Sequence, residues 1–176
     1  VGDIVKISVD GAPREFYVAH QGKPGDMYDD SCNGTWLLQR YAYTSRRYST
    51  YANSSYSASG VNTWCNGDYY NSIDSAVRGL IKQVKIPYRP GSTGTTIYSG
   101  AKGLSVYVFL LSVWEIGATS STVNIYCPHD GEMLDLFALS GAYAYKYFRR
   151  YNQESTRVYW TTRTPSTYGD SSGSAS

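Results

Sequence analysis

The longest apolar stretch in the chain, Leu104 to Ile116, is the feature that most limits what it can fold into. A helix needs about 20 apolar residues to cross a bilayer, so this stretch is too short to do so. Its near-continuous apolarity is typical of a strand that is covered on both faces. We therefore expect a core strand here and no insertion into a membrane.

Hydrophobic periodicity and turn residues predict short elements on either side of this stretch. Alternating apolar residues around Asp10-Gly11 predict a β-hairpin over residues 4–18. The other expected strands are 36–43, 82–87 and 158–163, and the expected helices are 53–67, a second opening at the cap Asp74, 130–139 and 143–151. This pattern predicts an α+β fold, a single domain of antiparallel sheets with two to four short helices. The domain spans residues 1–165, and residues 166–176 form a Ser/Gly-rich tail or the start of a truncated closing segment.

Size and charge exclude several classes of protein. The chain has 176 residues, enough for one domain that buries about 70% of its unfolded surface and needs no metal or disulfide to fold. Its net charge is +2, from sixteen basic and fourteen acidic residues spread along the chain. A nucleic-acid binder shows a basic stripe or patch, and the pairs Arg46-Arg47 and Arg149-Arg150 are too short to make one. We expect no nucleic-acid partner.

Residues that form disulfides or bind metals lack the spacing of known sites. The three cysteines, Cys32, Cys65 and Cys127, lie far apart and are odd in number, so we predict buried free thiols. The acidic loop 26–33 has neither the spacing nor the closing glutamate of an EF-hand. We expect no metal and no cofactor.

Tyrosine is unusually common, with nineteen residues in two main bursts, 41–70 and 143–168, interleaved with Ser, Asn, Thr and Arg. Such mixtures are typical of recognition surfaces, although tyrosine also packs well in strands. We interpret Tyr17, Tyr107 and Tyr126 as scaffold. The expected ligand-binding residues are the exposed tyrosines and their polar neighbours: Tyr43, Arg46, Arg47, Tyr48, Tyr51, Tyr151, Asn152, Tyr168 and Asp170.

Candidate catalytic residues are sparse. There are only two histidines, and we expect no nucleophile elbow on a strand-to-helix turn. The cluster of Cys127, His129 and Asp130 is better interpreted as a loop after a strand. Glu115 ends the apolar stretch, where a buried carboxylate needs a partner, and we expect a structural ion pair with Arg163 or Arg157. We predict that the protein is not an enzyme; a carbohydrate hydrolase that uses Glu115 and His129 is the alternative.

Several motifs occur in order along most of residues 1–165: Gly2 to Val5, Trp64-Cys65-Asn66-Gly67 before Tyr70 to Ile73, Ile81 to Tyr88, Val108 to Ser112 with Glu115, and Tyr159 to Pro165. Together they resemble a domain family of unknown function, DUF6273, which is widespread in gut Firmicutes and their phages. Family members continue to a closing strand with a G-V-R-P-A-like motif, so the resemblance implies that this chain is truncated or ends in a disordered segment. The layout of these last elements is similar to C-type-lectin-like domains of the formylglycine-enzyme type, which display variable binding loops.

Composition and resemblance together favour a non-catalytic recognition module of a phage particle or bacterial surface protein. Its expected partner is a host cell-surface glycan or protein, bound through Tyr-, Ser- and Asn-rich loops. The alternative is a structural virion component, a capsid-decorating or fibre domain that packs against other virion subunits, and a homo-oligomer is compatible with it. Either role places the protein in a virion or outside a cell, at its surface.

Overall fold

A three-stranded antiparallel sheet forms the N-terminal part of the molecule. The computed structural model describes residues 1–49, 55–91, 94–118, 127–139, 149–150, 157–158 and 161–165. β1 (Ile4–Val9) and β2 (Ala12–Gly22) form the predicted hairpin, and β3 (Gly34–Gln39) pairs with the other edge of β2. Asp10 and Gly11 have φ angles of 51° and 70°, the left-handed pair that a two-residue hairpin turn requires. The hairpin prediction is confirmed, whereas β3 ends before residue 43, the predicted limit.

A second antiparallel sheet consists of β4 (Val84–Ile86) and β5 (Leu104–Val106). β4 lies within the predicted strand 82–87, but the prediction of one long strand over 104–116 is wrong, because β5 ends at Val106. Beyond it the chain turns: the Ser112 N–H donates to Glu115 Oε2 at 2.8 Å, and the Glu115 N–H donates to Ser112 Oγ at 3.0 Å. Side-chain bonds thus satisfy backbone groups that a strand would pair with a neighbour. The last part of the stretch, residues 111–116 apart from the half-buried Trp114, is buried as expected, but it forms a turn.

A nearly continuous helical segment packs against the first sheet. Ser59 caps it by accepting a hydrogen bond from the Asn62 N–H at 3.1 Å. At its far end the Asp10 N–H donates to the Ser72 carbonyl at 2.9 Å, which fixes the β1–β2 turn against the helix. The segment consists of η2 (Tyr56–Ala58), α1 (Gly60–Trp64), the π-helical turn η3 (Cys65–Tyr69) and α2 (Tyr70–Ser72).

The predicted end of this helix near Asn66-Gly67 is wrong. The Asn66 amide donates to the Val108 carbonyl at 2.9 Å, and its oxygen accepts from the Tyr107 N–H at 2.7 Å. These bonds tie the middle of the helix to the chain after β5, so Asn66 does not end the helix. The next helix, α3 (Ser75–Arg78), opens at the predicted cap, where Asp74 accepts from the Ala76 N–H at 3.0 Å.

The remaining elements are short. They are η1 (Asp30–Cys32), η4 (Gly100–Lys102), α5 (Asp135–Ala138), β6 (Arg149–Arg150) and β7 (Arg157–Val158). α5 is the helical part of the predicted helix 130–139. At 149–150 the structure has a strand, so the predicted helix 143–151 is wrong there, and the rest of it lies outside the described residues. Of the predicted strand 158–163, residue 158 belongs to β7, and residues 162–163 are not in a strand.

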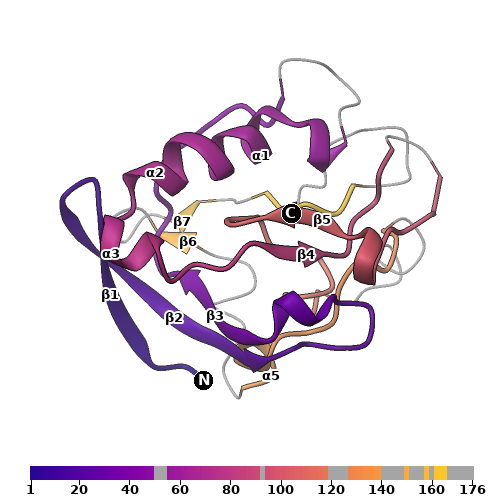
Figure 1. Cartoon of the computed structure of the whole chain (residues 1–176), viewed down its shortest axis with the longest axis horizontal. Coiled ribbons are helices and arrows are strands. Elements are labelled where there is room, and N and C mark those ends of the chain that lie inside the picture. The colour runs from indigo at the N-terminus through magenta and orange to yellow at the C-terminus, as the bar shows by residue number, and fades with distance from the viewer. Residues whose placement is uncertain are drawn as a thin grey trace.

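Two hydrophobic clusters fill the interior. The larger one packs β4, β5, α5 and the turn after β5 around Trp36, Ile86 and Phe137. The smaller one joins β1 and β2 to the helical segment through Phe16 and Tyr69. In the view of Figure 1, α1 and α2 lie along one side, β1 to β3 toward the other, and β4 and β5 between them. The predicted α+β class is confirmed. None of the described helices is long and apolar enough to span a membrane.

Candidate functional site

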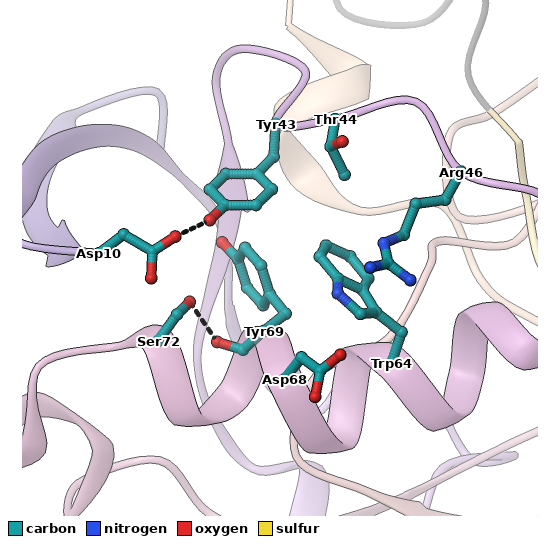
Figure 2. A pocket seen from close by; sticks show the side chains of 8 residues that line it. All are labelled: Asp10, Tyr43, Thr44, Arg46, Trp64, Asp68, Tyr69 and Ser72. Carbon is teal, nitrogen blue, oxygen red and sulfur yellow. Dashed lines mark hydrogen bonds between the residues drawn. The ribbon is translucent and has the colours of Figure 1, made fainter.

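An open pocket lies where the helical segment, the β1–β2 turn and the chain after β3 meet. Its volume is about 250 Å³. Figure 2 shows aromatic rings from the helix and from the chain after β3 facing one another, with carboxylates at two points of the rim. The lining residues are Asp10, Tyr43, Thr44, Arg46, Trp64, Asp68, Tyr69 and Ser72.

Three aromatic rings form the wall of the pocket. The Tyr43 ring meets the Tyr69 ring edge-on at 5.1 Å, and the Trp64 ring lies 5.3 Å from Tyr69 and 5.9 Å from Tyr43. The edge-to-face pair of Tyr43 and Tyr69 stabilises the cluster beyond simple area burial. Tyr69 is buried and its hydroxyl donates to Gln39 Oε1 at 2.5 Å. Tyr69 is thus the anchored base of the cluster, and the half-buried rings of Tyr43 and Trp64 face the opening.

The π-helical turn over Cys65–Tyr69 explains how one helix supplies two neighbouring rings. In a regular α-helix, residues five apart point about 140° away from each other. A π-turn closes with i to i+5 hydrogen bonds, so residues five apart come nearly into line. Trp64 and Tyr69 are five apart and in ring contact. Turns of this kind are frequent at functional sites.

The charged groups of the pocket are only partly paired with one another. Asp10 accepts a hydrogen bond from the Tyr43 hydroxyl, and this bond, with burial and the negative charge of Asp10, raises the pKa of Tyr43. Arg46 places its guanidinium carbon 4.7 Å from the Trp64 ring centroid, a cation–π contact. Asp68 is exposed and has no hydrogen-bond or ion-pair partner within the part of the chain that the structure describes. The pocket therefore offers one free carboxylate beside an aromatic wall.

The predicted ligand-binding residues are only partly brought together here. Tyr43 and Arg46 line the pocket, whereas Arg47 is exposed nearby and is not part of the lining. Tyr48 is half-buried and is not part of the lining, and burial raises its pKa to about 12. The other predicted residues lie outside the described residues: Tyr51, Tyr151, Asn152, Tyr168 and Asp170.

Sequence reasoning missed most of the pocket. Neither Trp64 nor Tyr69 is among the predicted ligand-binding residues, and Asp10 is predicted only as a turn residue. The spacing of Trp64 and Asp68, four apart on a helix, would have indicated a shared face. The contribution of Asp10 depends on how the hairpin turn docks on the helix, which no local pattern shows.

A second polar cluster is enclosed in the interior. Arg163 makes a bidentate ion pair with Glu115, with N–O distances of 2.5 and 2.6 Å, and both side chains are fully buried. This confirms the predicted structural ion pair. The Tyr28 hydroxyl donates to Glu115 Oε1 at 2.7 Å, and Arg163 also donates to the carbonyls of Leu110 at 2.9 Å and Asp130 at 3.0 Å. Each charge is surrounded by partners, which is what a buried pair needs to be tolerated.

Asp130 lies at the edge of this buried cluster. Its Oδ1 accepts from the Thr164 hydroxyl at 2.7 Å, while Oδ2 is buried without a hydrogen-bond partner. Burial raises the pKa of Asp130 to about 6, although the positive charge of Arg163 and the bond from Thr164 oppose the shift. The protonated form is therefore favoured in the folded protein below that pH.

The close packing of the cluster depends on the absence of a side chain at Gly131. A Cβ atom at this position would come within 2.3 Å of Ser112 Oγ, 2.9 Å of Glu115 Cγ and 3.1 Å of the Tyr28 hydroxyl. Real Cβ atoms do not approach other atoms so closely, so this backbone must pass here as glycine. The network is a structural junction between distant parts of the chain, with no room for a ligand.

The cysteine and histidine candidates do not form a nucleophilic site. The described thiols are all free, with Cys32 and Cys65 buried and Cys127 half-buried. Burial raises the pKa of the Cys32 thiol to about 11 and of the Cys65 thiol to about 12, which leaves both protonated at neutral pH. His129 is exposed and lies on Trp114, with ring centroids 4.2 Å apart, while the neighbouring Asp130 points into the interior. Within the described ranges, no group of three His, Cys, Asp or Glu could hold a metal ion.

Fold and pocket define a small α+β domain with an aromatic, partly acidic pocket. The model of a family described as a domain of unknown function, DUF6273, matches residues 33–176. The chain belongs to the DUF6273 family. The match includes the helical segment and Arg163, whereas Asp10 lies before it. Curated proteins and solved structures give no match, so the similarity to C-type-lectin-like domains stays a prediction.

Proposed function

We propose that this domain is a non-catalytic recognition module that binds a glycan of a host surface in the aromatic pocket. The phage or bacterial-surface setting comes from the family resemblance and belongs to the proposal. The observation that carries it is the combination of Trp64 and Tyr43, whose rings face the opening, with Asp68, a carboxylate on the same helix face. Binding sites typically combine an apolar wall with a few polar groups that fix orientation.

A sugar ring has the chemistry that this wall suits. One face of the ring carries C–H groups that pack on an aromatic side chain, and its rim carries hydroxyls that donate to carboxylates and accept from N–H groups. Asp68 can accept such bonds, and the hydroxyls of Thr44 and Ser72 extend the polar rim. The arrangement supports binding through the ring face, with the carboxylate setting the orientation.

The size of the pocket supports recognition of a single sugar unit. Its volume of about 250 Å³ lies below the range of about 300–1,000 Å³ that encloses drug-sized ligands. A site of this size binds weakly alone. Display in many copies on a particle would raise the avidity by about 10²–10⁴ without new contacts, which is consistent with a virion or cell-surface location.

A glycan array tests the proposal. We expect the wild-type chain, displayed in multiple copies, to bind a subset of bacterial envelope glycans, and Trp64→Ala to reduce that binding at least tenfold. Trp114→Ala is the matched control, because Trp114 lies on His129 and is not part of the pocket lining. Binding that survives Trp64→Ala, or that is lost equally in both variants, would contradict the assignment of the site.

A structural virion component is the second candidate, and exposed apolar residues favour it. Val1, Ile4 and Leu139 are 41%, 44% and 44% exposed, and a Cβ at Gly2 would lie 3.4 Å from Leu139. Apolar groups gathered at a surface are typical of subunit contacts. Light scattering distinguishes the candidates: a stable oligomer that Leu139→Lys dissociates favours the structural role, and a monomer opposes it.

The hydrolase alternative has less support. Glu115 is enclosed by Arg163, Tyr28 and Ser112, with no exposed surface. A catalytic carboxylate must reach the substrate within hydrogen-bond distance. The proposal that the module is non-catalytic is therefore retained.

A further inference from the structure

We propose that the pocket selects sugars that carry a free, protonated amine, and that Arg46 occupies the place of that amine until the ligand displaces it. This inference rests on the proposed function of the same pocket. It adds the chemical class of the ligand and a role for an intramolecular competitor. One cation, the Arg46 guanidinium, already lies on the aromatic wall.

Two arginines lie on rings of the aromatic cluster. The guanidinium carbon of Arg46 lies 4.7 Å from the Trp64 ring centroid, and that of Arg14 lies 5.6 Å from the Tyr43 ring centroid. A cation within about 6 Å of a ring centroid is attracted by the negative face of the ring. The cluster thus attracts positive charge at two separate rings.

Arg46 is held only weakly in its position. Its side chain is exposed, and the chain over residues 43–47 is in neither a helix nor a strand. Among the residues that the structure describes, no carboxylate forms an ion pair with Arg46, whose guanidinium lies on the Trp64 ring. Exposed side chains change rotamer in picoseconds to nanoseconds, so Arg46 can leave the ring without movement of the backbone.

The pocket becomes an anionic site when Arg46 leaves. Of the lining residues, Asp10 and Asp68 carry negative charge and Arg46 is the one that carries positive charge. One oxygen of Asp10 is used by the Tyr43 hydroxyl, and Asp68 is free of internal partners in the described ranges. Two carboxylates beside an aromatic wall complement a cation that is smaller than a guanidinium and attached to an apolar ring.

This charge pattern predicts how tightly different sugars bind relative to one another. An amine on a sugar can pair with Asp68 while the ring packs on Trp64, so one ligand uses both features. An N-acetylated sugar keeps the ring contact and loses the ion pair. A sugar with a carboxylate places like charges together, which costs binding free energy. We therefore expect free-amine sugars to bind most tightly and acidic sugars least tightly.

A matched pair of oligosaccharides tests the inference. The probes are the β-1,4-linked tetramers of glucosamine and of N-acetylglucosamine, titrated into the full chain at a pH that keeps the amine protonated. Binding is followed by the shift of the Trp64 indole N–H in NMR spectra. We expect the glucosamine tetramer to bind at least tenfold more tightly, and added salt to weaken it more than the acetylated tetramer.

Two variants separate the roles of the charged residues. Asp68→Asn should reduce the preference for the amine to less than threefold, because it weakens binding of the glucosamine tetramer much more than binding of the acetylated tetramer. Arg46→Met should strengthen amine binding severalfold, because the competing cation is removed. Both residues are exposed, so neither variant is expected to affect folding.

Each outcome bears on the inference. Equal binding of the two tetramers, an unchanged preference in Asp68→Asn, or weaker amine binding in Arg46→Met would overturn it. If the tetramers bind equally and Trp64→Ala abolishes both, the proposed glycan-binding function stands and the amine class fails. If neither the tetramers nor any glycan on the array binds, both the function and this inference fail.

Discussion

The aromatic pocket and the buried network around Arg163 both contain arginine, carboxylates and aromatic rings. Their charges are paired in the network and largely unpaired in the pocket. In the interior, Arg163 and Glu115 are fully buried and every charge is met by partners at 2.5–3.0 Å. At the pocket, and within the described part of the chain, Arg46 lies on a ring face without an ion-pair partner, and the Asp68 side chain has no hydrogen-bond or ion-pair partner. A saturated network leaves nothing for a ligand, whereas unsatisfied charges beside aromatic rings can bind one. The number of internal partners separates the two roles better than residue type does.

Substitution of an arginine by methionine should give the largest difference in stability between the two regions. Arg163→Met leaves Glu115 buried without its partner, which should lower the free energy of unfolding by about 3–5 kcal/mol. Arg46→Met removes an exposed contact and should change it by less than about 0.5 kcal/mol. Urea denaturation measures both values. If Arg163→Met is too unstable to purify folded, Glu115→Gln provides the same test, and similar losses at the two arginines would break the comparison.

The partly satisfied Asp130 should make the interior sensitive to pH. Its pKa is about 6 in the folded protein and about 3.9 for an unperturbed aspartate. The folded state therefore binds the proton more tightly. The resulting stabilisation is fully present below the unfolded value and is lost as the pH rises through 6. A pKa difference of this size corresponds to about 3 kcal/mol in the free energy of unfolding.

Unfolding measured from pH 4 to 7 for the wild type and Asp130→Asn tests this. Relative to the variant, the wild type should lose stability as the pH rises. Asp29 offers a control of opposite sign, because hydrogen bonds from the backbone and side chain of Ser31 lower the pKa of its carboxyl. Relative to Asp29→Asn, the wild type should gain stability as the pH rises through the unperturbed value of about 3.9, so this pair is measured at lower pH than the Asp130 pair. A difference between the wild type and Asp130→Asn that does not change with pH would show that Asp130 is not perturbed.

Substitution of a glycine by alanine should give the smallest difference in stability between the two regions. In Gly131→Ala the new Cβ meets Ser112, Glu115 and Tyr28 at 2.3–3.1 Å, and overpacking of this kind costs about 1–3 kcal/mol. Gly67 lies in the helical segment next to the pocket, and a Cβ there meets nothing within 4 Å. Gly67→Ala should stabilise the protein by about 0.5–1 kcal/mol, as alanine does in a helix. Thermal unfolding compares the two, and equal effects would contradict the packing difference.

Local patterns predicted the parts of this molecule that local physics determines. The Asp10-Gly11 turn, the cap at Asp74 and the alternation of β4 were all predicted, because each depends on neighbouring residues. The pairing of Glu115 with Arg163 was also predicted, since a buried carboxylate must find a cation.

Side-chain bonds to the backbone account for the failures. The stretch after Val106 turns because Ser112 and Glu115, three residues apart, bond each other, which apolarity alone does not show. The helix passes Gly67 because Asn66 bonds to residues 107–108, which are distant in sequence. The pocket needed the same kind of information, since the turn residue Asp10 joins it only through the docking of the hairpin on the helix.

The π-helical turn has a consequence for comparing members of this family. Such a turn contains one residue more than a turn of α-helix, so a chain that lacks one residue within 65–69 would form a regular helix there. The two aromatic positions would then be four apart, which in an α-helix is again a shared face, whereas the end of the helix would shift against the hairpin, because each residue turns the helix by about 100°. Homologues with either spacing can therefore pair the two rings, and the position of the helix end against the β1–β2 turn is what distinguishes them.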